Sequence, residues 1–270
     1  MFSDDTAFFA HFLEDMQEIV TRFARASKAL RLQVNIKKTE MMIQPPPGIN
    51  SHHRCIQISG EDLATEKDFK YLDSTTSYNN KLDTELQLRN SKASQAFGCL
   101  KDRYWFNRDL QIKTKCAVYS AIVLSTLLYG AESWTVYMAR ATSLNAYMMR
   151  HLRPTLCVKR WHRISNVDIL QKTNMPSILE TLVRRNFKWA GHLLRLDNTR
   201  RTKQILYCQL KEGNCSIGRS KLRFKDTVKT NLLQKGIPHR RWDKKANNRS
   251  LWRGPTRRKS SQDTVDSEEE

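Results

Sequence analysis

The sequence lacks several signals that would assign it to a familiar class of protein. No apolar run approaches the roughly 20 residues that a membrane-spanning helix needs. The first residues include Asp4 and Asp5 where a secretory signal peptide would carry basic residues. None of the six cysteines belongs to a Cys-x-x-Cys pair, so no common zinc-finger spacing is present. We therefore expect a nuclear or cytoplasmic protein with reduced cysteines.

Acidic residues are scarce relative to basic ones. The 270 residues include 47 Lys or Arg and 27 Asp or Glu, which gives a formal net charge of +20. Residues 184–259 hold 23 of the basic residues and four of the acidic ones, so nearly all of the excess lies in the last third. Such an imbalance is self-repelling unless a polyanion neutralises it. Nucleic acid is the commonest polyanion, and a membrane surface is the alternative.

The first 79 residues mix strand-like and helix-like patterns around a triple-proline break. An apolar–turn–apolar pattern predicts a hairpin, alternating apolar and polar residues predict strands, and apolar residues at helical spacing predict a helix. The expected order is a hairpin over 1–10, a helix over 13–31, a strand over 32–37, and short strands near 56–58 and 69–72. These elements would form a small antiparallel sheet packed against a helix.

The rest of the chain has mainly helical patterns, so the expected fold class is α+β. Helices are expected over 82–104, over 110–129 with Gly130 as a natural stop, after Ser165, after Ser177, and over 222–233. The two serines begin Ser-x-x-acid patterns, which are typical of helix starts. The composition divides the chain into 1–79, a helical 80–135, a basic helical 136–254 and a disordered tail over 255–270.

Asp4 and Asp5 are adjacent in the predicted turn of the first hairpin. Hard carboxylate oxygens are the ligands that Mg²⁺ prefers. Two metal ions held by such a turn can activate a primer hydroxyl and stabilise the leaving pyrophosphate. The dipeptide alone also fits an ordinary turn, so its meaning depends on the residues around it.

Several motifs in one order resemble those of LINE-type (non-LTR) retrotransposon reverse transcriptases. They include FSDD at 2–5, NIKKTE at 35–40, FKYL at 69–72 and NFKWAGHLLRLD at 186–197. The resemblance runs from Met1 to about Arg253. It implies part of a reverse-transcriptase palm over 1–79, a thumb over 80–135 and a basic carboxy-terminal region over 136–254.

The resemblance also implies a role for each motif. Asp4 and Asp5 would be catalytic ligands of Mg²⁺ or Mn²⁺, and Lys38 would contact the triphosphate of the incoming nucleotide. The residues that would grip the primer end are Phe69, Lys70, Tyr71 and Leu72. The intact enzyme would carry out RNA-directed DNA synthesis on an RNA and DNA template–primer.

Two departures from the family pattern bear on activity. Asp73 stands where the family usually has glycine, and a carboxylate there would repel a primer phosphate. A positive φ at this position would also be less favourable for Asp than for glycine. The family's fingers and first catalytic Asp lie upstream of the hairpin, outside this sequence. We therefore expect this chain alone to hold the metals improperly and to be inactive as a polymerase.

The basic last third is expected to bind RNA or DNA rather than a membrane, because basic residues neutralise phosphates and interleaved aromatic residues can stack on unpaired bases. The candidate contacts are Arg184, Arg185, Lys188, Arg219, Lys221, Arg223, Lys225, Arg240 and Arg241. The interleaved aromatic residues are Trp189, Phe224, Trp242 and Trp252. Core positions are the alternative for these rings, and we expect them for Phe187 and Trp189.

Two other interpretations fit the same residues. A non-enzymatic RNA- or DNA-binding protein derived from a retroelement would not need Asp4 and Asp5. A translated pseudogene fragment would leave apolar strand edges uncovered, which favours poor solubility.

Overall fold

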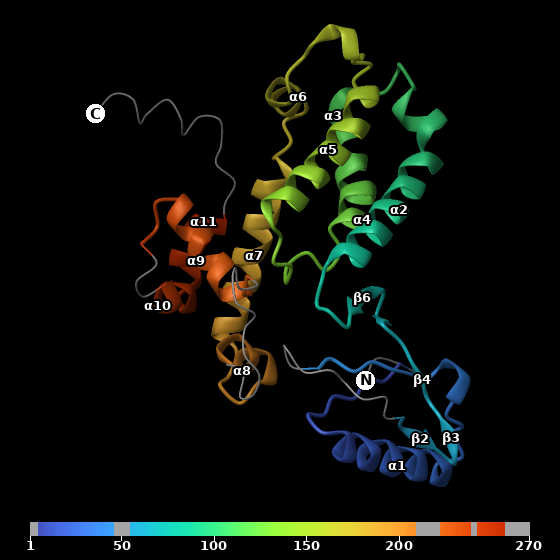
Figure 1. Cartoon of the computed structure of the whole chain (residues 1–270). Coiled ribbons are helices and arrows are strands. Elements are labelled where there is room, and N and C mark those ends of the chain that lie inside the picture. The colour runs from blue at the N-terminus through green and yellow to red at the C-terminus, as the bar shows by residue number, and fades with distance from the viewer. Residues whose placement is uncertain (1–4, 46–54, 209–221, 239–241, 257–270) are drawn as a thin grey trace. The chain divides into compact units, whose positions relative to one another are not determined.

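The computed structural model describes residues 5–45, 55–208, 222–238 and 242–256 (Figure 1). The described residues are mainly helical with small sheets, in agreement with the expected α+β class. Contacts divide the chain into two units. The first comprises Met1–Leu88 with Leu210–Ser220, and the second comprises Arg89–Gln209 with Lys221–Glu270. Among the described helices, none is long and apolar enough to cross a membrane.

The first unit is organised around helix α1 (Leu13–Ala29), which confirms the helix expected over 13–31. Its apolar stripe includes the buried Val20, which packs with Met41, Ile56 and Ile58 in a small core. Gln17 fixes the helix to the neighbouring strand, because its side chain donates to the carbonyl of Gln57 at 2.8 Å and accepts from the amide of Gln57 at 2.9 Å.

The strand expected over 32–37 is wrong. The segment instead ends in a 3-10 turn, η1 (Ile36–Lys38). Asn35 explains the difference, because its side-chain oxygen accepts from the amide of Lys38 at 3.2 Å and its carbonyl accepts from the Thr39 hydroxyl at 2.8 Å. Asparagine can thus satisfy nearby backbone groups locally, which competes with strand pairing.

Three separate two-stranded sheets replace the expected single antiparallel sheet in the described part of this unit. The paired strands are β1 (Glu40–Met41) with β4 (Ala64–Thr65), β2 (Gln57–Ile58) with β3 (Glu61–Asp62), and β5 (Asp68–Tyr71) with β6 (Ser74–Ser77). The first pair is parallel and the other two are antiparallel. The expected strands near 56–58 and 69–72 are therefore present, although a continuous sheet is not.

The first half of the second unit is a group of helices packed through aromatic rings. Its helices are α2 (Asp83–Cys99, which begins before the division), η2 (Lys101–Trp105), α3 (Ile112–Val118), η3 (Tyr119–Leu124), α4 (Ser125–Leu127) and α5 (Met138–Thr155). Phe97 stacks on the fully buried Trp105 with ring centroids 4.9 Å apart. Elements α3, η3 and α4 run on from one another, which confirms the helix expected over 110–129, and Gly130 follows with a φ of 72°.

The two helix starts expected after Ser165 and Ser177 are confirmed. Helix α6 (Asn166–Thr173) begins with a complete capping box between Ser165 and Asp168. Helix α7 (Ile178–Arg195) begins where the Ser177 hydroxyl accepts from the amide of Glu180 at 3.1 Å. A short 3-10 turn, η4 (Arg160–His162), precedes α6.

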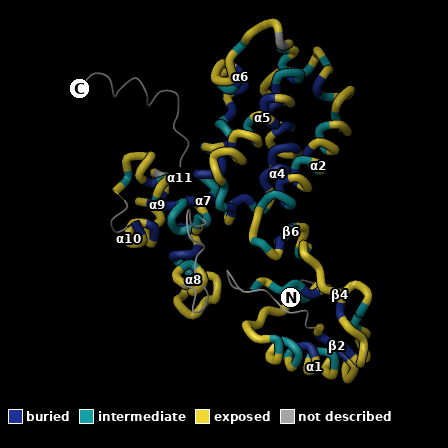
Figure 2. Tube along the Cα trace, in the orientation of Figure 1, coloured by how far each residue is buried: buried dark blue, intermediate teal, exposed yellow. Residues whose placement is uncertain are grey.

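Helix α7 is the centre of a second core, and Figure 2 shows buried stretches along α7, next to α9 and α11. These are α8 (Arg201–Tyr207), α9 (Phe224–Gln234, close to the expected 222–233), α10 (Trp242–Asn247) and α11 (Arg249–Thr256). Val228 and Leu232 of α9 pack against Phe187 of α7, and all three are fully buried. The disordered tail expected over 255–270 is wrong at its first two positions, which belong to α11, and the rest of it, 257–270, lies outside the described residues.

Candidate nucleic-acid interface

The side of α7 opposite its core carries a row of basic side chains. Arg184, Lys188 and His192 follow one another at a spacing of four residues, which places them on one face of the helix. Lys188 and His192 are exposed, and Arg184 is half-buried. The same helix therefore uses one face for the core and presents positive charge on the other.

Arg185 has a different environment from its neighbour Arg184. Its guanidinium donates to the carbonyl of Leu128 at 2.5 Å and to the carboxylate of Glu132 at 3.0 Å. These contacts tie α7 to the end of α4, so Arg185 has a structural role within the unit. Its role as a nucleic-acid contact stays a prediction, and Arg185 is not counted among the residues of the candidate interface.

The interleaved aromatic residues separate into two groups. Trp242 and Trp252 are buried in the core around α7, beside Phe187 as expected. The expected core position of Trp189 is only partly realised, because Trp189 is half-buried and its ring stacks on His192 with centroids 5.3 Å apart. The Trp252 indole donates to the carbonyl of Phe187 at 2.7 Å, which fixes that ring against α7. Only Trp189 and Phe224 among the four interleaved rings therefore line an open surface.

Trp189 and Phe224 line a hollow that we call the α7–α9 cleft, with a volume of about 560 Å³. Most of its lining side chains come from three helices, and they include Trp189 and Leu193 of α7, Ile205 and Tyr207 of α8, and Phe224, Lys225 and Lys229 of α9, with Arg223 just before α9. This volume lies within the roughly 300–1,000 Å³ that is typical of small-molecule sites. The cleft thus combines apolar and aromatic walls with several cationic side chains.

Charges at the start of α9 are partly paired. Arg223 forms an ion pair with Asp226 at 3.1 Å, with most of the Arg223 side chain exposed. The Lys225 ammonium lies 4.6 Å from the centroid of the Tyr207 ring, in a cation–π contact. Burial raises the pKa of the Tyr207 hydroxyl, and the nearby Asp243 carboxylate raises it further. Tyr207 therefore remains a neutral hydrogen-bonding group at neutral pH.

Several predicted contacts lie elsewhere. Arg219, Lys221, Arg240 and Arg241 lie outside the described residues, whereas Arg223 and Lys225 are brought to the cleft. Sequence reasoning missed Tyr207 and Lys229 as cleft residues. The spacing of Lys225 and Lys229, one helical turn apart on a short amphipathic helix, is the signal that could have found the second lysine.

The predicted catalytic carboxylates belong to the first unit. Asp4 lies outside the described residues, and Asp5 is exposed. Residues 6–10 form no strand, so the second arm of the expected hairpin is wrong. Lys38 is exposed at the end of η1, and its predicted contact with the triphosphate stays a prediction. Within the described part of the chain, no three His, Cys, Asp or Glu side chains are grouped as a metal site.

The predicted primer-grip residues form a tight hairpin between β5 and β6. Phe69, Lys70 and Tyr71 are in β5. Leu72 and Asp73 make the two-residue turn with φ values of 47° and 66°, the sign that such hairpin turns require at both positions. The backbone thus adopts at Asp73 the positive φ for which glycine is best suited. Asp73 also forms an ion pair with Lys70 at 3.6 Å.

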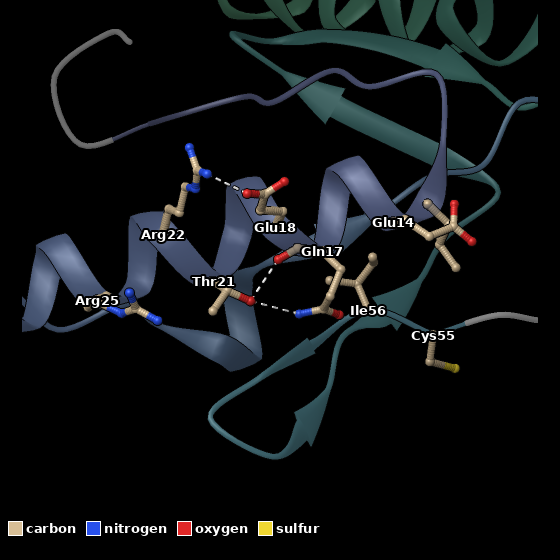
Figure 3. A pocket seen from close by; sticks show the side chains of 9 residues that line it. Glu14, Gln17, Glu18, Thr21, Arg22, Arg25, Cys55 and Ile56 are labelled. Atoms are coloured by element: carbon tan, nitrogen blue, oxygen red, sulfur yellow. Dashed lines mark hydrogen bonds and ion pairs between the residues drawn. The ribbon is translucent and has the colours of Figure 1, made fainter.

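A second hollow, of about 680 Å³, lies along α1 in the first unit (Figure 3). Ile56 lines it, and the α1 side chains Glu18 and Arg22 pair with each other across one helical turn. Gln17 and Thr21 are also hydrogen-bonded to each other there. These polar groups mainly satisfy one another along α1, so this hollow is a weaker candidate than the α7–α9 cleft.

Comparison with known proteins gives information on the origin of the chain. The described residues define an α+β protein with a basic, mainly helical second unit. Over 267 residues the sequence is 23% identical to a transposon-derived protein of Caenorhabditis elegans, covering 96% of this chain and 95% of that protein. This similarity supports a transposon origin. No protein-family model matches the sequence, and no solved structure matches the chain.

Proposed function

We propose that this chain is a retroelement-derived nucleic-acid-binding protein whose second unit contacts single-stranded RNA or DNA. The observation that carries the proposal is the basic row on α7, together with the cations at the start of α9 that line the cleft. The transposon origin of its relative supports a setting in which nucleic acid is the natural partner. The motif resemblance to LINE-type reverse transcriptases supports the same conclusion.

The charge distribution favours a polyanion over a neutral partner. Lysine and arginine side chains that neutralise phosphates release condensed counterions, which makes the affinity fall as salt concentration rises. Arg184 and Lys188 lie one turn apart on α7, so one strand of phosphates can meet both. We expect a nuclear or cytoplasmic location, where such a partner is available.

The test is the salt dependence of binding to a labelled single-stranded RNA, measured by fluorescence anisotropy with the full chain. Each single-strand phosphate contact contributes about 0.7 to the slope of log affinity against log salt. The double substitution Arg184→Gln and Lys188→Gln is therefore expected to reduce the slope by about 1.4. The matched control replaces Lys113 and Lys172, two exposed lysines on α3 and α6, and should leave the slope unchanged. A wild-type affinity that does not change with salt would contradict the proposal.

A relic polymerase site is the finer part of the proposal. Asp4, Asp5, Lys38 and the hairpin of Phe69, Lys70, Tyr71 and Leu72 would correspond to the metal-binding, triphosphate and primer-grip positions of the resembled family. The described residues supply no complete ligand set for Mg²⁺ or Mn²⁺, so no catalytic step is assigned to them. In a primer-extension assay with Mg²⁺ we expect no extension by this chain alone. Replacing Asp4 and Asp5 with Ala should leave RNA affinity unchanged.

A further inference from the structure

We propose that the α7–α9 cleft receives one unpaired nucleobase, with the Trp189 ring as its stacking surface. This inference rests on the proposed nucleic-acid binding and deepens it, because it assigns a particular site and a ligand class: a nucleotide in a single strand. It distinguishes this site from the basic row on α7, which can contact phosphates without accommodating any base.

The shape of the cleft fits a planar, largely apolar ligand. Trp189 and Leu193 lie one turn apart on α7 and form one wall, and Phe224 of α9 also lines the cleft. Ile205 of α8 is 69% exposed although it is a large aliphatic residue. Exposed apolar groups gathered in a hollow favour binding of an apolar surface, and the face of a nucleobase is such a surface.

The charges around the cleft fit the phosphates on either side of such a base. Lys225 and Lys229 lie one turn apart on α9, and Arg223 precedes them. Among the described side chains that line the cleft, Asp226 is the one acidic residue, and it is paired with Arg223. Cations beside an aromatic wall are the arrangement by which proteins hold single strands, since the cations follow the backbone while the rings stack on bases.

A paired base fits this site less well than an unpaired one. In a duplex the faces of each base are covered by its neighbours, so only base edges and phosphates reach a protein. The face of Trp189 can be used by a base only after that base leaves its stack, which costs energy in a duplex and little in a flexible strand. The cleft should therefore favour single strands over duplexes of the same sequence.

The experiment compares the wild type and three variants, all full-length, on two ligands. The ligands are a 12-nucleotide single-stranded RNA and an abasic strand of the same length, which keeps the phosphates and lacks the bases. Trp189→Leu is expected to weaken RNA binding roughly 5- to 150-fold, the range that loss of one base stacked on an aromatic ring produces, and to leave binding to the abasic strand unchanged. Trp189→Phe should recover part of the loss.

Trp161→Leu is the matched control. Trp161 is an exposed tryptophan of the second unit with the Lys159 ammonium 4.9 Å from its ring centroid, and it is not among the residues that line the cleft. Loss of the Trp161 ring should change neither the affinity for the RNA nor the affinity for the abasic strand. Circular dichroism of each variant checks that the helices are retained.

A second measurement uses the wild-type protein and so does not depend on a variant folding. RNA that carries 5-iodouridine is irradiated in the complex, and the cross-linked residue is located by mass spectrometry. A cross-link at Trp189, Tyr207 or Phe224 supports the inference, and cross-links confined to other residues overturn it.

The outcomes separate this inference from the proposed function. Salt-dependent RNA binding that Trp189→Leu does not weaken overturns the nucleobase site and leaves the proposed function intact. Wild-type protein that does not bind RNA overturns both. Equal affinity for RNA and for vesicles containing anionic phosphatidylserine would also overturn the site, because it would show attraction to charge alone.

Discussion

At the scale of single residues, Gly191 decides how closely α11 approaches α7. An added Cβ at this position would lie 2.5 Å from Cδ1 of Trp252, which is closer than packed atoms can be. The Trp252 indole also donates to the Phe187 carbonyl on the same helix, so displacing the ring would break a buried hydrogen bond. Glycine is therefore needed here for space, and its φ is not the reason.

Gly191→Ala is expected to lower the free energy of unfolding by about 1–3 kcal/mol, since overpacking of a filled core has this cost. Urea denaturation of the full chain measures it. The control is Gly98→Ala in α2, where an added Cβ would meet no atom within 4 Å. That substitution should be neutral or stabilising by up to about 1 kcal/mol through helix propensity. Equal effects at the two positions would contradict the packing explanation.

His151 is expected to make the stability of the second unit depend on pH. Its ring lies between Phe97 and Tyr147, with centroids 4.3 and 4.4 Å away, and its Nδ1 lies 3.0 Å from the Tyr147 carbonyl. Burial lowers the pKa of His151 below its ordinary value of 6.5, and the neighbouring Arg150 lowers it further, against an opposing effect of the Tyr147 carbonyl. The neutral imidazole is therefore the form that the fold prefers.

A lowered pKa means that the unfolded chain binds a proton at a higher pH than the folded chain does. The contribution of His151 to stability is present above pH 6.5 and is lost as pH falls through 6.5 toward the lower folded pKa. We expect the difference in unfolding free energy between wild type and His151→Gln to be larger at pH 8 than at pH 5, measured by urea denaturation. A difference that does not change with pH would show that burial of this imidazole is not coupled to folding.

At the scale of elements, the β5–β6 hairpin is held in a turn that its sequence suits poorly. Leu72 and Asp73 both have positive φ, which costs most L-residues roughly 1–2 kcal/mol each and costs Asp less. The exposed ion pair between Lys70 and Asp73 offsets little of this. The register of the strands is kept by four paired positions from Asp68 with Ser77 to Tyr71 with Ser74.

Replacing Leu72 with Asn and Asp73 with Gly should therefore stabilise the hairpin, by about 1–2 kcal/mol. Hydrogen exchange of the amides in β5 and β6 measures this, with slower exchange as the expected result. The control Ser74→Gly changes a strand position and should speed exchange, because glycine in a strand costs about 0.5–1 kcal/mol. Unchanged exchange in the double variant would mean that the turn is not the limiting feature of this element.

At the scale of the whole molecule, the chain contains separate hydrophobic cores in its two units. One core surrounds Val20 and Ile56 in the first unit, and another surrounds Phe187 and Trp252 in the second. No residue that the structure describes belongs to both of these clusters. Independent cores generally permit independent unfolding, because each cooperative transition reflects the loss of one packed interior.

We expect hydrogen exchange to resolve two opening transitions, one reported by α1 and one by α7. Single-stranded RNA at about 100 times its dissociation constant should stabilise the α7 transition by about 2.7 kcal/mol and leave the α1 transition unchanged. Protection of both helices to the same extent would show that the two units open together. Protection of α1 alone would place the binding surface in the first unit and contradict the proposal.

Much of the helical structure could be predicted from the sequence. The helix expected over 13–31 is α1, and the two serine caps begin α6 and α7, because apolar spacing and capping depend on residues within a few positions. The strand over 32–37 could not be predicted correctly, since a local Asn35 hydrogen bond favours a turn despite the alternating pattern.

The presence of charge and aromatic rings in the candidate site could be predicted from the sequence, but the set of residues that line it could not. Positive charge and interleaved aromatic rings indicated a nucleic-acid surface, and Lys225 was among the residues expected there. Which rings remain accessible could not be read from spacing, because Trp242, Trp252 and Trp189 have similar local surroundings in the sequence and different neighbours in the fold.

The sequence by itself determined the excess of charge in the last third, the helix starts and the apolar face of α7, because each depends on composition or on residues close along the chain. Only the tertiary structure decided that Trp252 rests on Gly191 and that Trp189 lines the α7–α9 cleft. The physical reason is that burial depends on contacts between helices far apart in the sequence, and those contacts exist only when the core has formed.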